Sequence, residues 1–169
     1  GMIHFQNWRL ISDDLVVIQL NESGCYLLDG IPLLKLISKN LHNYFNLDPN
    51  LYYPVGYDGT KVYVPDEALG NSIKPLNVPL NLEQVVILKP LQPDQDLDIV
   101  PLNTINALVA LTYHLYNPWS LLAEEYKAQA NLITQVLNKN VNVHSFGFPK
   151  SIDKLPEVCN RLDNICTDR

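Results

Sequence analysis

The sequence predicts an α/β or α+β fold in a single domain spanning residues 2–169. Apolar runs of strand length, bounded by turn residues, concentrate in the first half and the middle of the chain. Segments with helical spacing of apolar residues crowd the C-terminal half. The length of 169 residues corresponds to about one domain, and 47% apolar against 18% charged residues excludes a disordered chain.

A β-hairpin is predicted over residues 15–28. The aliphatic run 15–20 (LVVIQL) and the returning run 25–28 (CYLL) flank the turn cluster 21–24 (NESG). A further strand is predicted for residues 8–11 (WRLI). Residues 12–14 (SDD), which are poorly suited to a strand interior, separate that strand from the hairpin.

The segment 33–45 is predicted to be a helix because its apolar residues fall at positions 33, 34, 37, 41 and 45. Prolines and glycine then predict a loop over 46–57. Residues 61–64 (KVYV) alternate as a strand that ends at Pro65, and residues 84–88 (QVVIL) predict a strand covered on both faces.

Three helices and one strand are predicted for the C-terminal half. The first helix is capped by Asn103 or Thr104 and runs to about Tyr116. After the second helix comes a strand over 141–146, and the last helix spans 151–166, with Pro156 tolerable only in its first turn. The inward residues are Leu122, Tyr126, Ile133 and Leu137 of the second helix and Leu155, Val158, Cys159 and Leu162 of the last.

Charge and composition exclude several classes of partner. The net charge is −6 and Lys and Arg do not cluster, which argues against nucleic acid as a partner. No apolar run approaches the roughly 20 residues of a membrane helix, so we expect a cytoplasmic protein that does not bind membranes. Three cysteines without C-x-x-C spacing argue against a disulfide framework or a zinc site; Cys159 and Cys166, seven residues apart, are expected to be buried on one helix face.

Residues 7–18 (NWRLISDDLVVI) resemble a segment of the HPr kinase/phosphorylase family, whose fold is shared with phosphoenolpyruvate carboxykinases. Further landmarks follow in the family's order: 31–36 (IPLLKL), 58–65 (DGTKVYVP), 85–88 (VVIL), 102–113 and 141–146. The resemblance spans nearly the whole chain and corresponds to the C-terminal two-thirds of the kinase domain. It implies a partial, mixed kinase-like sheet with helices concentrated in the C-terminal half.

The resemblance implies that Asp13 and Asp14 are the catalytic and metal-binding pair. Of two adjacent carboxylates, one can coordinate Mg²⁺ while the other accepts a proton from the phosphoacceptor hydroxyl. Active members also carry a glycine-rich phosphate-binding loop upstream, but no stretch of this sequence has the spacing G-x-x-x-x-G-K. Because phosphoryl transfer depends on positioning and electrostatics, the chain alone is not expected to be a competent kinase.

Three hypotheses follow. The first is a degenerate kinase-like domain without cofactors that serves as a partner-binding or regulatory module. The second is a truncated or split ATP-dependent serine kinase that uses Mg²⁺ and ATP, with its loop upstream or on another chain. The third is a fortuitous resemblance in some other α/β protein. Gly1 before Met2 is typical of a tag remnant, and we therefore expect the chain to be the whole gene product.

Two surface expectations complete the interpretation. Absence of the loop-bearing strands is expected to leave a sheet edge uncovered, which favours a homo-oligomer or a protein or peptide partner. Four tyrosines, at positions 52, 53, 57 and 63, gather near the predicted loop. Core and loop packing is the commoner explanation for such a cluster, and a surface facing a nucleotide or a partner is the alternative.

Overall fold

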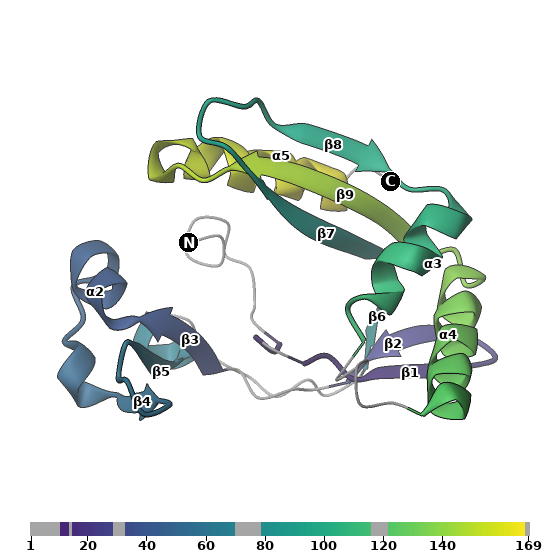
Figure 1. Cartoon of the computed structure of the whole chain (residues 1–169), viewed down its shortest axis with the longest axis horizontal. Helices are drawn as coiled ribbons and strands as arrows, with labels where there is room; N and C mark the ends of the chain where they lie inside the picture. Colours follow the sequence, from purple (N-terminus) through teal and green to yellow (C-terminus); the bar gives the residue numbers. More distant parts are fainter. Residues whose placement is uncertain (1–10, 14, 29–32, 70–78, 116–121, 168–169) are drawn as a thin grey trace. The chain divides into compact units, whose positions relative to one another are not determined.

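The structure is a computed structural model that describes residues 11–13, 15–28, 33–69, 79–115 and 122–167 (Figure 1). The described residues form a mixed α/β arrangement of three small sheets and four α-helices. The chain divides into two compact units, one of Gly1–Val17 with Leu28–Pro79 and one of Ile18–Leu27 with Leu80–Arg169. The single domain expected from the sequence remains a prediction, and the two compact units are described separately below.

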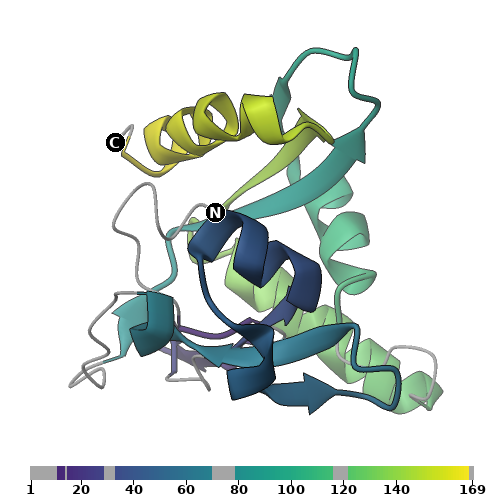
Figure 2. The ribbon, with the colours of Figure 1, turned by 90° about the vertical axis from the view of Figure 1, so that its left-hand side faces the viewer.

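The first unit is built on an antiparallel sheet of order β3-β5-β4 (Figures 1 and 2). Its strands are β3 (Leu33–Ile37), β4 (Tyr53–Val55) and β5 (Lys61–Pro65). Short helical turns complete the unit: α2 (Ser38–Asn40), the π-helix η1 (Leu41–Phe45), and the 3-10 helices η2 (Pro49–Leu51) and η3 (Asp66–Leu69).

One side of this sheet carries the core of the first unit. Leu41, Val62 and Val64 are buried, and Leu36 and Tyr52 pack against them. The prediction of a helix over residues 33–45 is wrong for the first five residues, which form β3. The apolar positions of this segment are compatible with the period of a helix and with that of a strand. Pairing with β5 favours the strand, in which Leu36 lies opposite the buried Val62. The predicted loop over 46–57 contains the short strand β4.

The second unit contains the predicted hairpin in a sheet of order β1-β2-β6, formed by β1 (Ile18–Asn21), β2 (Gly24–Leu27) and β6 (Leu80–Asn81). The Asn21 side-chain oxygen accepts hydrogen bonds from the N–H groups of Ser23 and Gly24, at 3.0 Å each. The hairpin is thereby confirmed, although regular pairing begins at Ile18 and not at residue 15. Of the strand predicted upstream, residues 8–10 lie outside the described part, and Ile11 forms a bend.

A second sheet of this unit has the order β7-β9-β8. Strands β7 (Gln84–Leu91) and β9 (Asn142–Pro149) are parallel, and β8 (Asp98–Pro101) joins β9 antiparallel. Because β7 is an edge strand, it tolerates Pro90, and Leu88 is exposed. The expectation that residues 84–88 are covered on both faces is therefore wrong at Leu88.

Helices α3 (Thr104–Thr112), α4 (Ala123–Leu137) and α5 (Leu155–Thr167) belong to the second unit. Asn103 caps α3, as predicted, by accepting a hydrogen bond from the N–H of Asn106 at 2.9 Å. The helix nevertheless ends at Thr112, earlier than expected. On α4, Ile133 is buried, but Leu122 and Tyr126 at the helix start are exposed, so only the second half of the predicted stripe faces the core.

The last helix, α5, lies alongside β7 and β9 in both views (Figures 1 and 2). Its buried residues are Val158, Cys159 and Leu162, as predicted. The helix begins at Leu155 and not at residue 151 as predicted, because a 3-10 turn (Ile152–Lys154) precedes it, and Pro156 therefore stands in its first turn. Cys166 is exposed, contrary to expectation, because it lies in the last turn of the helix. Among the described residues, no helix is both long and apolar enough to span a membrane.

Candidate functional site

Asp13, one of the two carboxylates singled out by the sequence, lies at the edge of the β3-β5-β4 sheet. Its Oδ2 accepts a hydrogen bond from the backbone N–H of Lys35, at 2.9 Å. Lys35 pairs with Tyr63 across β3 and β5, and its N–H points away from β5 toward Asp13. The carboxylate therefore completes the hydrogen bonding of an edge strand, which is a structural role.

The second carboxylate of the predicted pair is not described. Asp14 lies outside the described residues, so the predicted pair stays a prediction. In the described part of the chain, no group of three or more His, Cys, Asp or Glu side chains is placed to hold a metal ion. One carboxylate that already accepts a backbone hydrogen bond does not by itself fit the Mg²⁺ site that the family resemblance implies.

The outer side of the same sheet carries two rows of paired residues. One row runs Lys35–Tyr63–Tyr53 across the three strands, and the next row consists of Ile37, Lys61 and Val55. Directly paired residues project to the same side of a sheet, so these six side chains share one surface, which we call the lysine–tyrosine face. The Lys35 ammonium lies 5.8 Å from the centroid of the Tyr63 ring, within range of a cation–π interaction.

The predicted tyrosine cluster separates into different environments. Tyr52 packs against the core of the first unit, as the commoner explanation requires. Tyr53 and Tyr57 are exposed, and Tyr53 has an exposed fraction of 84%. The alternative of a surface facing a partner therefore fits Tyr53 and Tyr57. Sequence reasoning recognised the alternation of residues 61–64 but assigned residues 33–37 to a helix, and it therefore missed that Lys35, Lys61 and Tyr63 lie on one side of a sheet.

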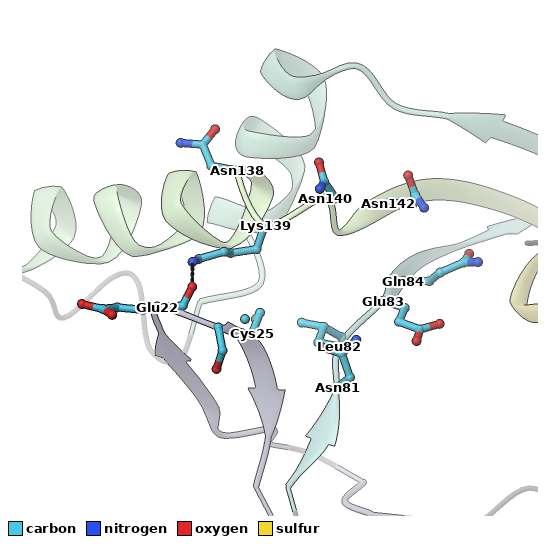
Figure 3. A pocket seen from close by; sticks show the side chains of 12 residues that line it. Glu22, Cys25, Asn81, Leu82, Glu83, Gln84, Asn138, Lys139, Asn140 and Asn142 are labelled. Carbon is cyan, nitrogen blue, oxygen red and sulfur yellow. Dashed lines mark hydrogen bonds between the residues drawn. The ribbon is translucent and has the colours of Figure 1, made fainter.

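A polar cleft of about 480 Å³ lies in the second unit, between the turn of the β1–β2 hairpin, the β6–β7 connection and the α4–β9 connection (Figure 3). The Lys139 ammonium donates a hydrogen bond of 2.8 Å to the carbonyl oxygen of Glu22, which ties the end of α4 to the hairpin turn. Figure 3 shows the carboxylates of Glu22 and Glu83 pointing in opposite directions. The labelled acidic groups therefore do not converge on one ligand position.

The remaining labelled groups of this cleft indicate a structural joint rather than a reaction centre. The carboxamides of Asn138, Asn140 and Asn142 point away from the hairpin (Figure 3). Cys25 is buried beneath the cleft, and burial raises the pKa of its thiol above the ordinary value. A thiol kept protonated in this way is a poor nucleophile.

Two buried polar atoms of the second unit make no hydrogen bond within the described part of the chain: Gln84 Oε1 and His144 Nδ1. The Gln84 Nε2 atom donates to the carbonyl oxygen of Ile165 at 2.6 Å, which fixes the orientation of the amide and joins β7 to α5. His144 lines a second cavity of about 260 Å³ beside Thr104 and Ala107 of α3. Among the described residues, no carboxylate is hydrogen-bonded to either atom, so neither atom belongs to an acid–base pair.

Comparison with protein-family models, with curated proteins and with solved structures gives no match to this chain. The candidate sites therefore rest on the sequence and the geometry described above.

Proposed function

We propose that this chain is a degenerate HPr kinase-like domain that acts as a partner-binding or regulatory module and is not catalytic by itself. The observation that carries the proposal is the 2.9 Å hydrogen bond from the Lys35 N–H to Asp13 Oδ2. It gives one of the two predicted catalytic aspartates a structural role in the sheet. The lack of a G-x-x-x-x-G-K spacing in the sequence supports the same function, because such a loop supplies most phosphate contacts.

The fold proposed for the chain is a partial HPr kinase/phosphoenolpyruvate carboxykinase-like domain, and the proposed location is the cytoplasm. The ordered series of sequence landmarks supports the fold. The alternative function is a truncated or split ATP-dependent serine kinase. The retained SDD element favours this alternative, since a site without function has no need of adjacent aspartates.

Calorimetry tests the proposal directly. The chain is titrated with ATP and Mg²⁺, and the titration is repeated with the Asp13→Asn/Asp14→Asn variant. We expect no heat of binding at millimolar nucleotide for either protein. Binding by the wild type that the double variant loses would establish a working aspartate site and favour the split kinase.

A homo-oligomer formed through an open sheet edge belongs to the same proposal, and β1 is the edge that suits it. Among the described residues, β1 has a strand on one side only, and four consecutive exposed apolar side chains occupy residues 15–18. The Leu28 N–H donates a hydrogen bond to the Val17 carbonyl oxygen. Because residues of an antiparallel strand alternate between facing the partner strand and facing away from it, the backbone N–H and C=O groups of Ile18 and Leu20 point away from β2. Such an edge is a template for a further strand.

Sedimentation tests the oligomer. We expect a concentration-dependent dimer at micromolar protein and a monomer for Ile18→Pro, which removes an outward N–H while keeping the hairpin hydrogen bonds. Circular dichroism of the variant checks that its fold is preserved. A wild-type chain that sediments as a clean monomer contradicts pairing at β1.

A further inference from the structure

Strand β7 forms an open edge of the β7-β9-β8 sheet, although its sequence suits the interior of a sheet. The run 85–88 (VVIL) is continuously apolar, a pattern typical of strands inside a parallel sheet. Among the described residues, however, β7 pairs with β9 alone. Leu88, near the middle of the strand, is 52% exposed. The sheet therefore has an open position for a further strand beside β7.

The backbone of β7 directs every second residue away from β9. The carbonyl oxygen of Glu83 accepts a hydrogen bond of 3.0 Å from the N–H of Asn142, so the alternation turns the odd-numbered residues toward β9. The residues that face outward are Gln84, Val86, Leu88 and Pro90. Within the described part of the chain, none of them makes a backbone hydrogen bond on that side. Because Pro90 has no N–H, a further strand can form a regular ladder along residues 84–88.

Lys89 is the one charged residue of β7, and its ammonium selects the charge of an added strand. The side chain is exposed and makes no ion pair within the described part of the chain. In the row of residues that crosses the sheet at Lys89, Asp98 lies on β8 beyond Gly147 of β9, roughly 10 Å away between backbones. The added strand would lie on the other side, about 4.8 Å from β7. A carboxylate on that strand therefore comes closer to Lys89 than Asp98 does.

The two sides of the sheet require different side chains on the added strand. Leu88 and Lys89 are consecutive, so their side chains project to opposite sides of the sheet. An antiparallel partner, which forms the more stable ladder, places one residue opposite Lys89 and its next residue opposite Leu88. A carboxylate residue followed directly by an apolar residue therefore complements both side chains.

A second copy of the chain is the less suitable occupant of this edge. Self-association is already proposed for the edge of β1, and a second self-pairing edge would link copies into an open-ended assembly instead of a closed dimer. A segment of another protein adds one strand at β7 and ends the sheet there.

We propose that β7 binds an extended segment of a partner protein as an added antiparallel strand, in which a carboxylate residue is followed directly by an apolar residue. This inference rests on the proposed partner-binding function and names the site and the chemistry of the partner. The backbone groups of Gln84, Val86 and Leu88 supply the hydrogen bonds. The ammonium of Lys89 pairs with the carboxylate, and the exposed side chain of Leu88 contacts the apolar residue. In such complexes the main chain gives affinity and the side chains give specificity.

Fluorescence anisotropy with the labelled peptide Thr-Glu-Val-Thr-Val-Thr-Thr and the full chain tests the proposal. With its Glu opposite Lys89, the two valines lie opposite Leu88 and Val86 and exchange backbone hydrogen bonds with them. N-methylation of both valines removes those hydrogen bonds and is expected to weaken binding by about tenfold or more. N-methylation of the two threonines that follow the valines directly is the matched control. Their N–H groups point away from β7, so the affinity should be unchanged.

Substitutions in the chain separate the backbone contribution from the charge. Val86→Pro removes an outward N–H and leaves the ladder with β9 intact, so it is expected to weaken peptide binding by about tenfold. Ile18→Pro, which blocks the edge of β1, is the matched control and should leave the affinity unchanged. Lys89→Gln, or Gln in place of the peptide's Glu, should weaken binding by about 2- to 5-fold, the range of exposed ion pairs. The two changes together should cost no more than either alone.

Four outcomes overturn the proposal. The first two are equal effects of the two N-methylated peptides, and loss of binding in Ile18→Pro when circular dichroism shows a preserved fold. The third is equal affinity of the Glu and Gln peptides, which removes Lys89 from the site. The fourth is a wild-type dimer that Val86→Pro converts to a monomer, which assigns β7 to self-association.

Failure of this inference is distinct from failure of the proposed function. If the peptide does not bind and ATP with Mg²⁺ gives no heat, the edge of β7 is wrongly assigned while the non-catalytic module stands. If nucleotide binds through the aspartates, the module proposal fails whether or not the peptide binds.

Discussion

Replacing Asp13 by alanine tests whether its carboxylate is part of the sheet. The substitution removes the acceptor of the Lys35 N–H, which lies 2.9 Å from Oδ2. A hydrogen bond to a charged group contributes roughly 1.5–3 kcal/mol in general, but the exposed position of Asp13 reduces this to about 1 kcal/mol. Because 1.4 kcal/mol corresponds to about tenfold in an equilibrium, the Lys35 amide should exchange with solvent roughly fivefold faster.

Amide hydrogen exchange followed by NMR measures this effect at one residue. Asp13→Asn keeps an acceptor oxygen without the charge, so we expect it to preserve more of the protection of Lys35 than Asp13→Ala does. The amides of Leu34 and Leu36 are internal controls, because the alternation directs them toward β5. Unchanged exchange at Lys35 in Asp13→Ala, or equal effects of Asn and Ala, would refute the structural role of Asp13.

Four further predictions concern the second unit. Phe146→Ala removes a fully buried side chain of β9 and should lower the free energy of unfolding by about 3–5 kcal/mol in urea titrations; a loss below about 1 kcal/mol contradicts the burial. Asn103→Ala should cost about 1 kcal/mol of stability through loss of the α3 cap, whereas Asn103→Asp should retain most of it. Cys25 and Cys159 are buried whereas Cys166 is exposed, so at mildly alkaline pH a thiol reagent should modify Cys166 first, although desolvation and the nearby Asp163 carboxylate raise the pKa of its thiol as well. The unfolded chain loses these thiol protons before the folded chain does, so stability should fall as the pH rises above 9.0, and Cys25→Ala should reduce that fall.

Features set by local chemistry were the ones that the sequence could predict. The hairpin follows from the turn residues 21–24, where Asn21 binds two following N–H groups. The start of α3 follows from a side chain that caps a helix three residues away. Pro156 correctly marks the first turn of α5. In each case the deciding contact lies within a few residues.

Features decided by distant partners escaped prediction. Residues 33–37 have an apolar pattern compatible with either a helix or a strand, and the choice depends on β5, which begins 24 residues after β3 ends. The partner of Asp13 is a backbone N–H 22 residues further on, which no motif encodes. The lysine–tyrosine face exists only once the register of β3, β5 and β4 is known. Sequence therefore identified the candidate carboxylate, and only geometry identified its contact.

The dimer proposed at the edge of β1 is expected to resist salt. Its interface depends on backbone hydrogen bonds and on exposed apolar side chains such as Ile18, neither of which is screened strongly by ions. Raising the salt from 0.1 M to 1 M shortens the Debye length from about 10 Å to about 3 Å, which weakens attraction between exposed charges. A dimer that persists in 1 M salt therefore agrees with pairing at β1. A dimer that dissociates in 1 M salt is held by charge, and β1 is then not its interface.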